Sequence, residues 1–220
     1  MATRRLLADL VTAYGAASSD AQITVESLGG VEAAKRVAAG EACDIVVLAA
    51  GALDKLIAQG HVTPGSRVDL VQSPVALAIK AGAPRPPIAS ENDVREAVSR
   101  ARSIGYSTGP SGDHLMALLN RWGVRAALQD RIVQAPPGVP VASLVASGDV
   151  ELGFQQLSEF MTAEGIEVLG LLPASLQNIT IFAGGIARGS AAEERARTLL
   201  AFMASPETAA LKRQHGMEPA

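Results

Sequence analysis

The feature that most constrains the fold of this chain is a steady alternation of short β-branched runs with helix-forming runs. The clearest strand is the apolar run 43–49, which has the composition of a strand buried on both faces and is expected to bury Cys43. Further strands are predicted at 23–27, 68–71, 75–79, 103–107, 132–134, 152–155, 166–171 and 179–183. Alternating strands and helices indicate an α/β fold with parallel or mixed sheets.

Length and charge narrow the classes of protein to which the chain can belong. With 220 residues it can form one large domain or two small lobes. The net charge of −3 argues against nucleic-acid binding, which needs a basic face. The longest apolar stretch, 45–53, is far shorter than the roughly 20 residues of a membrane-spanning helix. The single cysteine excludes an intrachain disulfide.

Three turns that contain glycine stand between a predicted strand and a predicted helix, at 27–31, 107–112 and 136–140. The first N–H groups of a helix have no acceptor within the helix and carry partial positive charge. Glycine lets a ligand approach this backbone closely, and in open α/β sheets such turns lie where ligands bind. The three turns together predict a site for a small anion.

Motifs of catalysis and metal binding are incomplete. Ser111 lacks the second glycine of a nucleophile elbow, and no phosphate-loop lysine follows a glycine-rich turn. His61, His114 and His215 are too dispersed to share a metal, so neither a metal nor a cofactor is expected. Gln155 and Gln156 end a predicted strand and offer amide donors to an anion, and Gln156 is expected to face the ligand.

Several segments resemble the molybdate-type substrate-binding proteins of ABC transporters. They are 40–48, 52–62, 65–70, 148–159, 202–210 and 216–219. The resemblance covers nearly the whole chain. It implies a type II periplasmic-binding-protein fold, with mixed or parallel sheets flanked by helices and a ligand held between two lobes. It also places residues 1–72 and 183–220 in one lobe and 73–182 in the other.

Two positions depart from the pattern that this resemblance implies. Gly29 and Gly30 stand where the family has hydroxyl side chains, and Gln156 stands where it has a tyrosine. A branch of the same superfamily isomerises aconitate. An organic polycarboxylate is therefore an alternative to an inorganic oxyanion, both as ligand and as substrate.

The family also begins with a strand that this sequence does not show, because the chain opens at the first predicted helix. A missing central strand would leave buried backbone groups unpaired, at about 1–3 kcal/mol each. We therefore expect the native protein to start upstream of Met1. The resemblance implies the periplasm, but no signal peptide is visible in this chain, which leaves the cytoplasm as the alternative.

The leading interpretation is a monomeric binding protein that delivers a small anion to an ABC transporter permease. The predicted ligand-binding residues are Thr3, Gly29, Gly30, Ser111, Gly112, Val139 and Gln156. The alternative is an isomerase acting on a polycarboxylate, with His114, Asp113 and Glu159 as the candidate bases. A ligand-sensing domain of a transcription regulator is a third reading, disfavoured because no helix-turn-helix segment is present.

Overall fold

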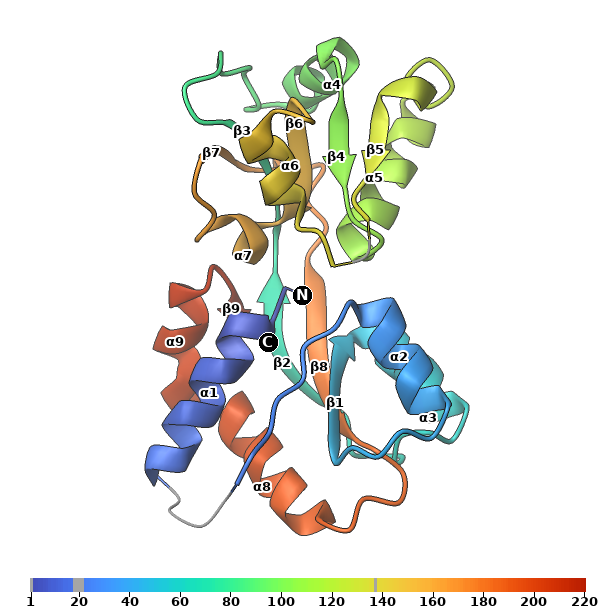
Figure 1. Ribbon diagram of the computed structural model, residues 1–220, viewed down its shortest axis with the longest axis vertical. Coiled ribbons are helices and arrows are strands. Elements are labelled where there is room, and N and C mark those ends of the chain that lie inside the picture. The colour runs from blue at the N-terminus through green and yellow to red at the C-terminus, as the bar shows by residue number, and fades with distance from the viewer. Residues whose placement is uncertain (1, 18–21, 137) are drawn as a thin grey trace. The chain divides into compact units, whose positions relative to one another are not determined.

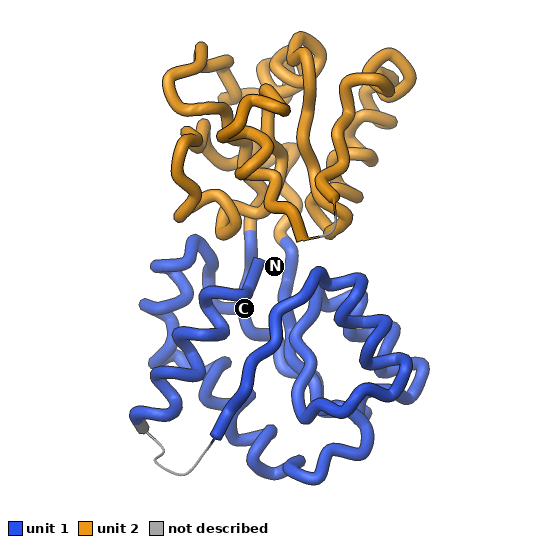
Figure 2. Tube along the Cα trace, viewed as in Figure 1, with its two compact units in different colours: residues 1–73, 180–220 blue, residues 74–179 orange. Residues whose placement is uncertain are grey.

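The chain folds into two compact units, and the computed structural model describes residues 2–17, 22–136 and 138–220. Unit 1 combines two separate parts of the chain, Met1–Ser73 and Thr180–Ala220, whereas unit 2 is the continuous segment Pro74–Ile179 (Figure 2). Within the described residues, no helix is long and apolar enough to cross a membrane.

Unit 1 is a sheet with helices on both faces (Figure 1). In chain order its elements are α1 (Arg4–Ala17), α2 (Gly30–Ala38), β1 (Ile45–Ala49), α3 (Ala50–Ala58), β2 (Val68–Ser73), β8 (Thr180–Ile186), α8 (Glu193–Ala204), the 3-10 helix η2 (Pro206–Thr208), α9 (Ala209–Gln214) and β9 (Glu218–Pro219). The strand order is β1-β8-β2-β9, and each of these neighbouring pairs is antiparallel. One core packs α1 and α8 on the sheet, and a second core packs α2 and α3 on its other face.

Unit 2 is a five-stranded mixed sheet that is also covered on both faces. Its elements are β3 (Val75–Lys80), α4 (Glu91–Arg100), β4 (Ile104–Tyr106), α5 (Pro110–Arg121), the 3-10 helix η1 (Gln129–Arg131), β5 (Ile132–Gln134), α6 (Val141–Ser147), β6 (Leu152–Gln156), α7 (Leu157–Phe160) and β7 (Ile166–Leu171). In the order β5-β4-β6-β3-β7, the first three strands run parallel, and β3 is antiparallel to β6 and β7. Helices α4 and α5 cover one face, and α6 and α7 cover the other.

The chain passes between the units twice, after Ser73 and after Ile179. On the unit 2 side, Gln177 ties these two passages together. Its Oε1 accepts from the Val75 N–H at 2.8 Å, and its Nε2 donates to the Val75 carbonyl at 3.0 Å. One amide therefore satisfies both backbone groups of a residue 102 positions away in sequence.

The predicted α/β class is confirmed, and the sheet of unit 2 is mixed, whereas the described strands of unit 1 pair antiparallel. Two local predictions are wrong. Residues 22–29 form no strand, and β1 pairs with β8 alone among the described strands. Without a neighbour, the run 23–27 has no ladder in which to place its N–H and C=O groups. Cys43 is exposed rather than buried, because the strand begins two residues later, at Ile45.

Candidate functional site

The turn that begins α2 is open. Gly29 is the N-cap residue and no side chain caps the helix; the first backbone bond runs from the Ala33 N–H to the Gly29 carbonyl at 2.9 Å. The N–H groups of the first turn, at Gly30, Val31 and Glu32, thus have no acceptor within the helix. A Cβ atom at Gly29 would meet nothing within 4 Å, and one at Gly30 would meet only Leu48 at 3.9 Å. Neither glycine has a positive φ, so neither backbone conformation nor packing requires glycine here.

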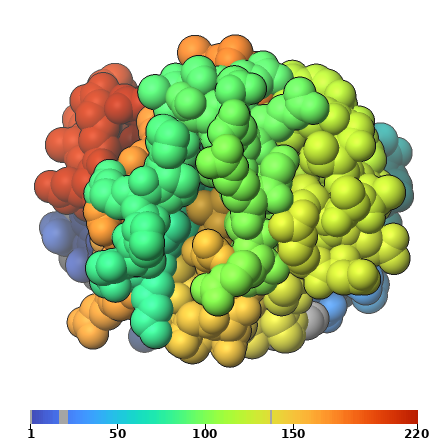
Figure 3. Space-filling view, turned by 90° about the horizontal axis from the view of Figure 1, so that it is seen from above, coloured from blue at the N-terminus to red at the C-terminus, as the bar shows by residue number. Residues whose placement is uncertain are grey.

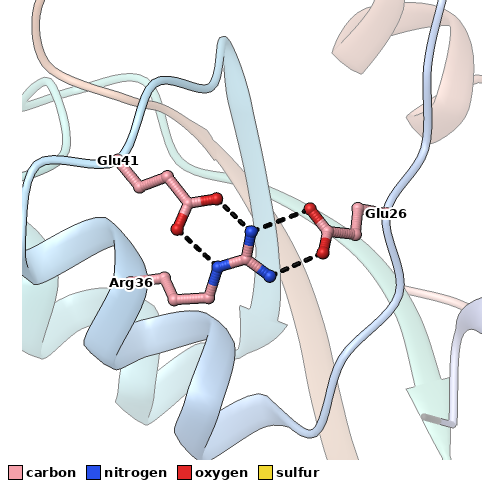
Figure 4. A network of polar contacts seen from close by, with 3 residues as sticks. All are labelled: Glu26, Arg36 and Glu41. Atoms are coloured by element: carbon pink, nitrogen blue, oxygen red, sulfur yellow. Dashed lines mark hydrogen bonds and ion pairs between the residues drawn. The ribbon is translucent and has the colours of Figure 1, made fainter.

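An exposed charge cluster holds the segment that leads into this turn. The guanidinium of Arg36, on α2, lies between the carboxylates of Glu26 and Glu41, which precede and follow the helix (Figure 4). Arg36 donates to Glu26 at 2.6 and 3.0 Å. Its hydrogen bonds lower the pKa of Glu41 below its ordinary value of 4.5. The pairing of Arg36 with Glu26 spans ten residues of irregular chain and helix, so no local sequence pattern indicates it.

The turn that begins α5 is closely packed. Ser111 is 1% exposed and Gly112 is buried. The N–H groups of Gly112 and Asp113 both donate to the Gly109 carbonyl, at 2.9 and 3.2 Å, and Pro110 has no N–H. In this first turn only the Ser111 N–H is left without an intrahelical acceptor. A Cβ at Gly112 would lie 1.9 Å from the Ser107 carbonyl oxygen, so this position must be glycine.

The third predicted turn offers less to a ligand. The Val139 N–H donates to the Pro136 carbonyl at 3.0 Å, so this backbone donor is already engaged. The Val139 side chain is 37% exposed. Helix α6, which follows, is only seven residues long.

Thr3 lies directly before α1 and is 8% exposed. Its carbonyl accepts from the Leu7 N–H at 2.8 Å. This is the first backbone bond of the helix, and no bond of the Thr3 hydroxyl to a described residue is found.

The two glutamines at the end of β6 are almost completely buried, each 2% exposed. Gln156 is on the same face of the strand as Phe154, and its cross-strand neighbour is Val75 of β3. The side chain or backbone of Gln156 already interacts with a partner. Gln155 is on the other face, and its Oε1 has no hydrogen-bond partner; the buried Ser158 Oγ, at the start of α7, has none either. These two unpaired oxygens are features that sequence inspection did not single out.

The three candidate bases lie in different environments. His114 places Nε2 2.7 Å from the Leu176 carbonyl. Since a carbonyl only accepts, Nε2 carries the proton, and in the neutral ring Nδ1 keeps its lone pair. Asp113 is exposed. Glu159 is partly buried, and this burial raises its pKa, although a hydrogen bond from the Gln155 side chain opposes the shift.

The predicted site residues divide between the two units. Thr3, Gly29 and Gly30 belong to unit 1, and the predicted positions between Ser111 and Glu159 belong to unit 2. Within unit 2, β4 and β6 are parallel neighbours. The α5 turn and the Gln155–Gln156 end therefore lie at the same edge of the sheet, the edge where α/β sheets bind ligands.

A separate groove of about 570 Å³ lies beside β7, between residues 85–89 and 169–171. Figure 3 looks onto this side of unit 2, where the blue-green residues of the segment 85–89 are at the surface. Arg85, at one side of the groove, pairs with Glu167 of β7. None of the predicted site residues lines this groove.

The fold is that of two-lobed periplasmic binding proteins of type II. The periplasmic molybdate-binding protein of Azotobacter vinelandii matches with a TM-score of 0.75 and 22% identity, over 98% of this chain and 94% of that one. The tungstate ABC transporter from Geobacter sulfurreducens matches with a TM-score of 0.73 and 16% identity, over 95% of this chain and 92% of that one. At these identities the likeness concerns the fold.

The family is established by sequence. Residues 1–218 match the model of the bacterial extracellular solute-binding proteins, and the chain belongs to this family. It is also 37% identical, over 185 residues, to a protein from Pseudomonas sp. named aconitate isomerase. That match covers 84% of this chain and 70% of its relative.

Proposed function

We propose that this protein binds a small anion outside the cytoplasm and delivers it to an ABC-type permease. The observation that carries this proposal is the open N-terminus of α2. Gly29 and Gly30 are required neither by backbone conformation nor by packing within unit 1. Their effect is to leave three N–H groups of a helix N-terminus accessible, which suits an anion.

Within unit 2, the α5 turn is a second candidate for anion binding. It offers the Ser111 N–H and the Ser111 hydroxyl, and Gly112 permits the close packing that holds them. The other predicted ligand-binding residues are Thr3 in unit 1 and Gln156 and Val139 in unit 2, and Val139 offers only its side chain. Family membership supports the role in solute uptake, and the named ligands of the structural relatives support an anion.

The experiment is a thermal-shift screen of the full chain, followed by calorimetry on any ligand found. The panel contains molybdate, tungstate, sulfate, citrate, and cis- and trans-aconitate. A ligand at 100 times its Kd should stabilise the folded state by about 2.7 kcal/mol. The proposal fails if no anion of the panel raises the melting temperature and none gives a calorimetric signal.

A second candidate function is isomerisation of an unsaturated polycarboxylate, favoured by the 37% identity to the aconitate isomerase. Such a shift moves a proton from one carbon to another, so it needs a base that can return the proton and no redox cofactor. Glu159, whose pKa is raised by burial, is suited to this role, and so is His114, whose Nδ1 lone pair is available. Exposed Asp113 is the third candidate.

An absorbance assay of cis- and trans-aconitate interconversion tests this second function. Turnover that falls at least about 100-fold in Glu159→Gln or His114→Ala would support it, since general bases contribute about 10²–10⁴-fold. Asp113→Asn tests the exposed carboxylate in the same assay. If the wild-type protein binds aconitate without turnover, the binding function stands alone.

A further inference from the structure

The end of β6 carries polar groups that the proposed anion site does not use. Gln155 is 2% exposed, yet its Oε1 has no hydrogen-bond partner among the described residues, and the buried Ser158 Oγ has none there either. Their neighbour Glu159 is partly buried and is hydrogen-bonded to the Gln155 side chain. Buried polar atoms in folded proteins nearly always have a partner, so two unpaired oxygens within four residues call for one.

The orientation of the Gln155 amide follows from its bond to Glu159. The bond stabilises the ionised carboxyl, and a carboxylate only accepts, so the amide Nε2 must face it. The remaining group of Gln155 is thus an acceptor, Oε1. The sequence had suggested an amide donor for an anion here. The structure leaves an acceptor instead.

Gln155 lies at the edge of the sheet formed by the carboxyl ends of the parallel strands. Its cross-strand neighbour on β3 is the small residue Ala76. On the same face, α6 and α7 pack so closely on β6 that a Cβ at Gly153 would lie 2.7 Å from Val145. Gln155 comes after this packed stretch, at the carboxyl end of a strand parallel to β4, and β4 leads into the turn that begins α5. This is the edge at which α/β sheets bind ligands.

We infer that Gln155, supported by Ser158, selects a small organic acid that carries a hydroxyl group, because the ligand must donate a proton to Oε1. This inference rests on the proposed anion-binding function and names the class of ligand. A bare oxyanion such as molybdate offers only acceptors and leaves Oε1 unpaired and facing negative charge. A site built to bond a hydroxyl discriminates strongly against the analogue that lacks it.

Calorimetry on the full chain with matched acids tests this inference. The pairs are L-malate with succinate and citrate with tricarballylate, and the members of each pair differ by one hydroxyl. The wild-type protein should bind the hydroxy acid of at least one pair about 10-fold more tightly than its partner, and more tightly than molybdate. In Gln155→Met, which keeps the length of the side chain but removes the acceptor, the preference should fall to within about twofold.

Two further variants keep the test sharp. Gln129→Met changes an exposed glutamine of η1 in the same way and should leave the preference unchanged. Ser158→Ala, a smaller change, should reduce the preference if Gln155→Met does not fold.

The possible failures are distinguishable. Equal binding within both pairs, tighter binding of molybdate, or a preference that survives in Gln155→Met and in Ser158→Ala would overturn the inference and leave anion binding intact. If no acid and no oxyanion binds at all, the proposed function fails with it.

Discussion

The turns that begin α2 and α5 contain the same residue types but are built differently. At α2 the glycines have room around them, and the segment leading to them is held by exposed charges. At α5 the backbone packs so closely that Gly112 cannot carry a side chain, and the polar groups nearby are buried. Packing therefore requires glycine in the second turn and not in the first, where we propose that it gives a ligand access. Sequence alone cannot separate these two reasons.

The largest expected effect is on stability, at the α5 turn. Gly112→Ala places a Cβ against the Ser107 carbonyl, which is backbone and cannot easily move. We expect a loss of about 2–4 kcal/mol in the free energy of unfolding, measured by urea denaturation. Gly51→Ala in α3, where a Cβ meets nothing within 4 Å, is the control and should gain up to about 1 kcal/mol. Equal effects of the two substitutions would contradict the comparison.

The corresponding substitution at the α2 turn should weaken ligand binding and should not destabilise the fold. Gly30→Ala puts a methyl group beside the free N–H groups, and it should raise stability by about 0.5 kcal/mol because the unfolded chain loses freedom. Affinity for the anion found in the screen should fall about 10-fold, measured by calorimetry. Unchanged affinity would remove Gly30 from the binding site.

The next contrast is in the response to pH. Burial raises the pKa of Glu159 in the folded protein above its ordinary value of 4.5, so the folded state binds more protons than the unfolded state. The contribution of this residue to stability should therefore fall as pH rises from 4.5 through the raised pKa. Glu159→Gln should flatten that part of the stability–pH curve, as measured by urea denaturation across pH 4–8. A wild-type curve already flat in this range would refute the prediction.

The smallest effect is expected at the exposed cluster around Arg36, and it has the opposite sign. Arg36 lowers the pKa of Glu41, so its contribution is present above pH 4.5 and is lost as pH falls through the lowered pKa. Arg36→Gln should remove this loss of stability at acid pH. It should change the free energy of unfolding little at neutral pH, because exposed ion pairs contribute little to stability. Thermal unfolding of both proteins at pH 3–5 and at low salt measures this difference in stability. A large loss of stability in Arg36→Gln at pH 7 would show that the cluster does more than hold an exposed segment.

Much of the fold could be predicted because patterns of burial are local. The strands predicted at 132–134 and 166–171 have the bounds found in β5 and β7. The strand predicted at 23–27 failed because a strand depends on a neighbour that its own sequence does not encode. At the candidate site, the glycines of the α2 turn predicted a backbone that a ligand could approach, and the turn is open, but its role in binding stays a prediction. The bond between Gln155 and Glu159 could not be predicted, because the direction of an amide depends on the packing around it.

The position of β8 has a consequence for how the protein is made. In unit 1, β1 and β2 each pair with β8 and not with each other, yet β8 is synthesised after the whole of unit 2. Unit 2 is continuous and can fold as soon as it leaves the ribosome, whereas the first 73 residues must wait for residues 180–186. During that interval β1, which is entirely apolar, and β2 lack their common partner. We therefore expect nascent chains that end before β8 to depend on chaperones and to be cut by proteases within unit 1 before unit 2.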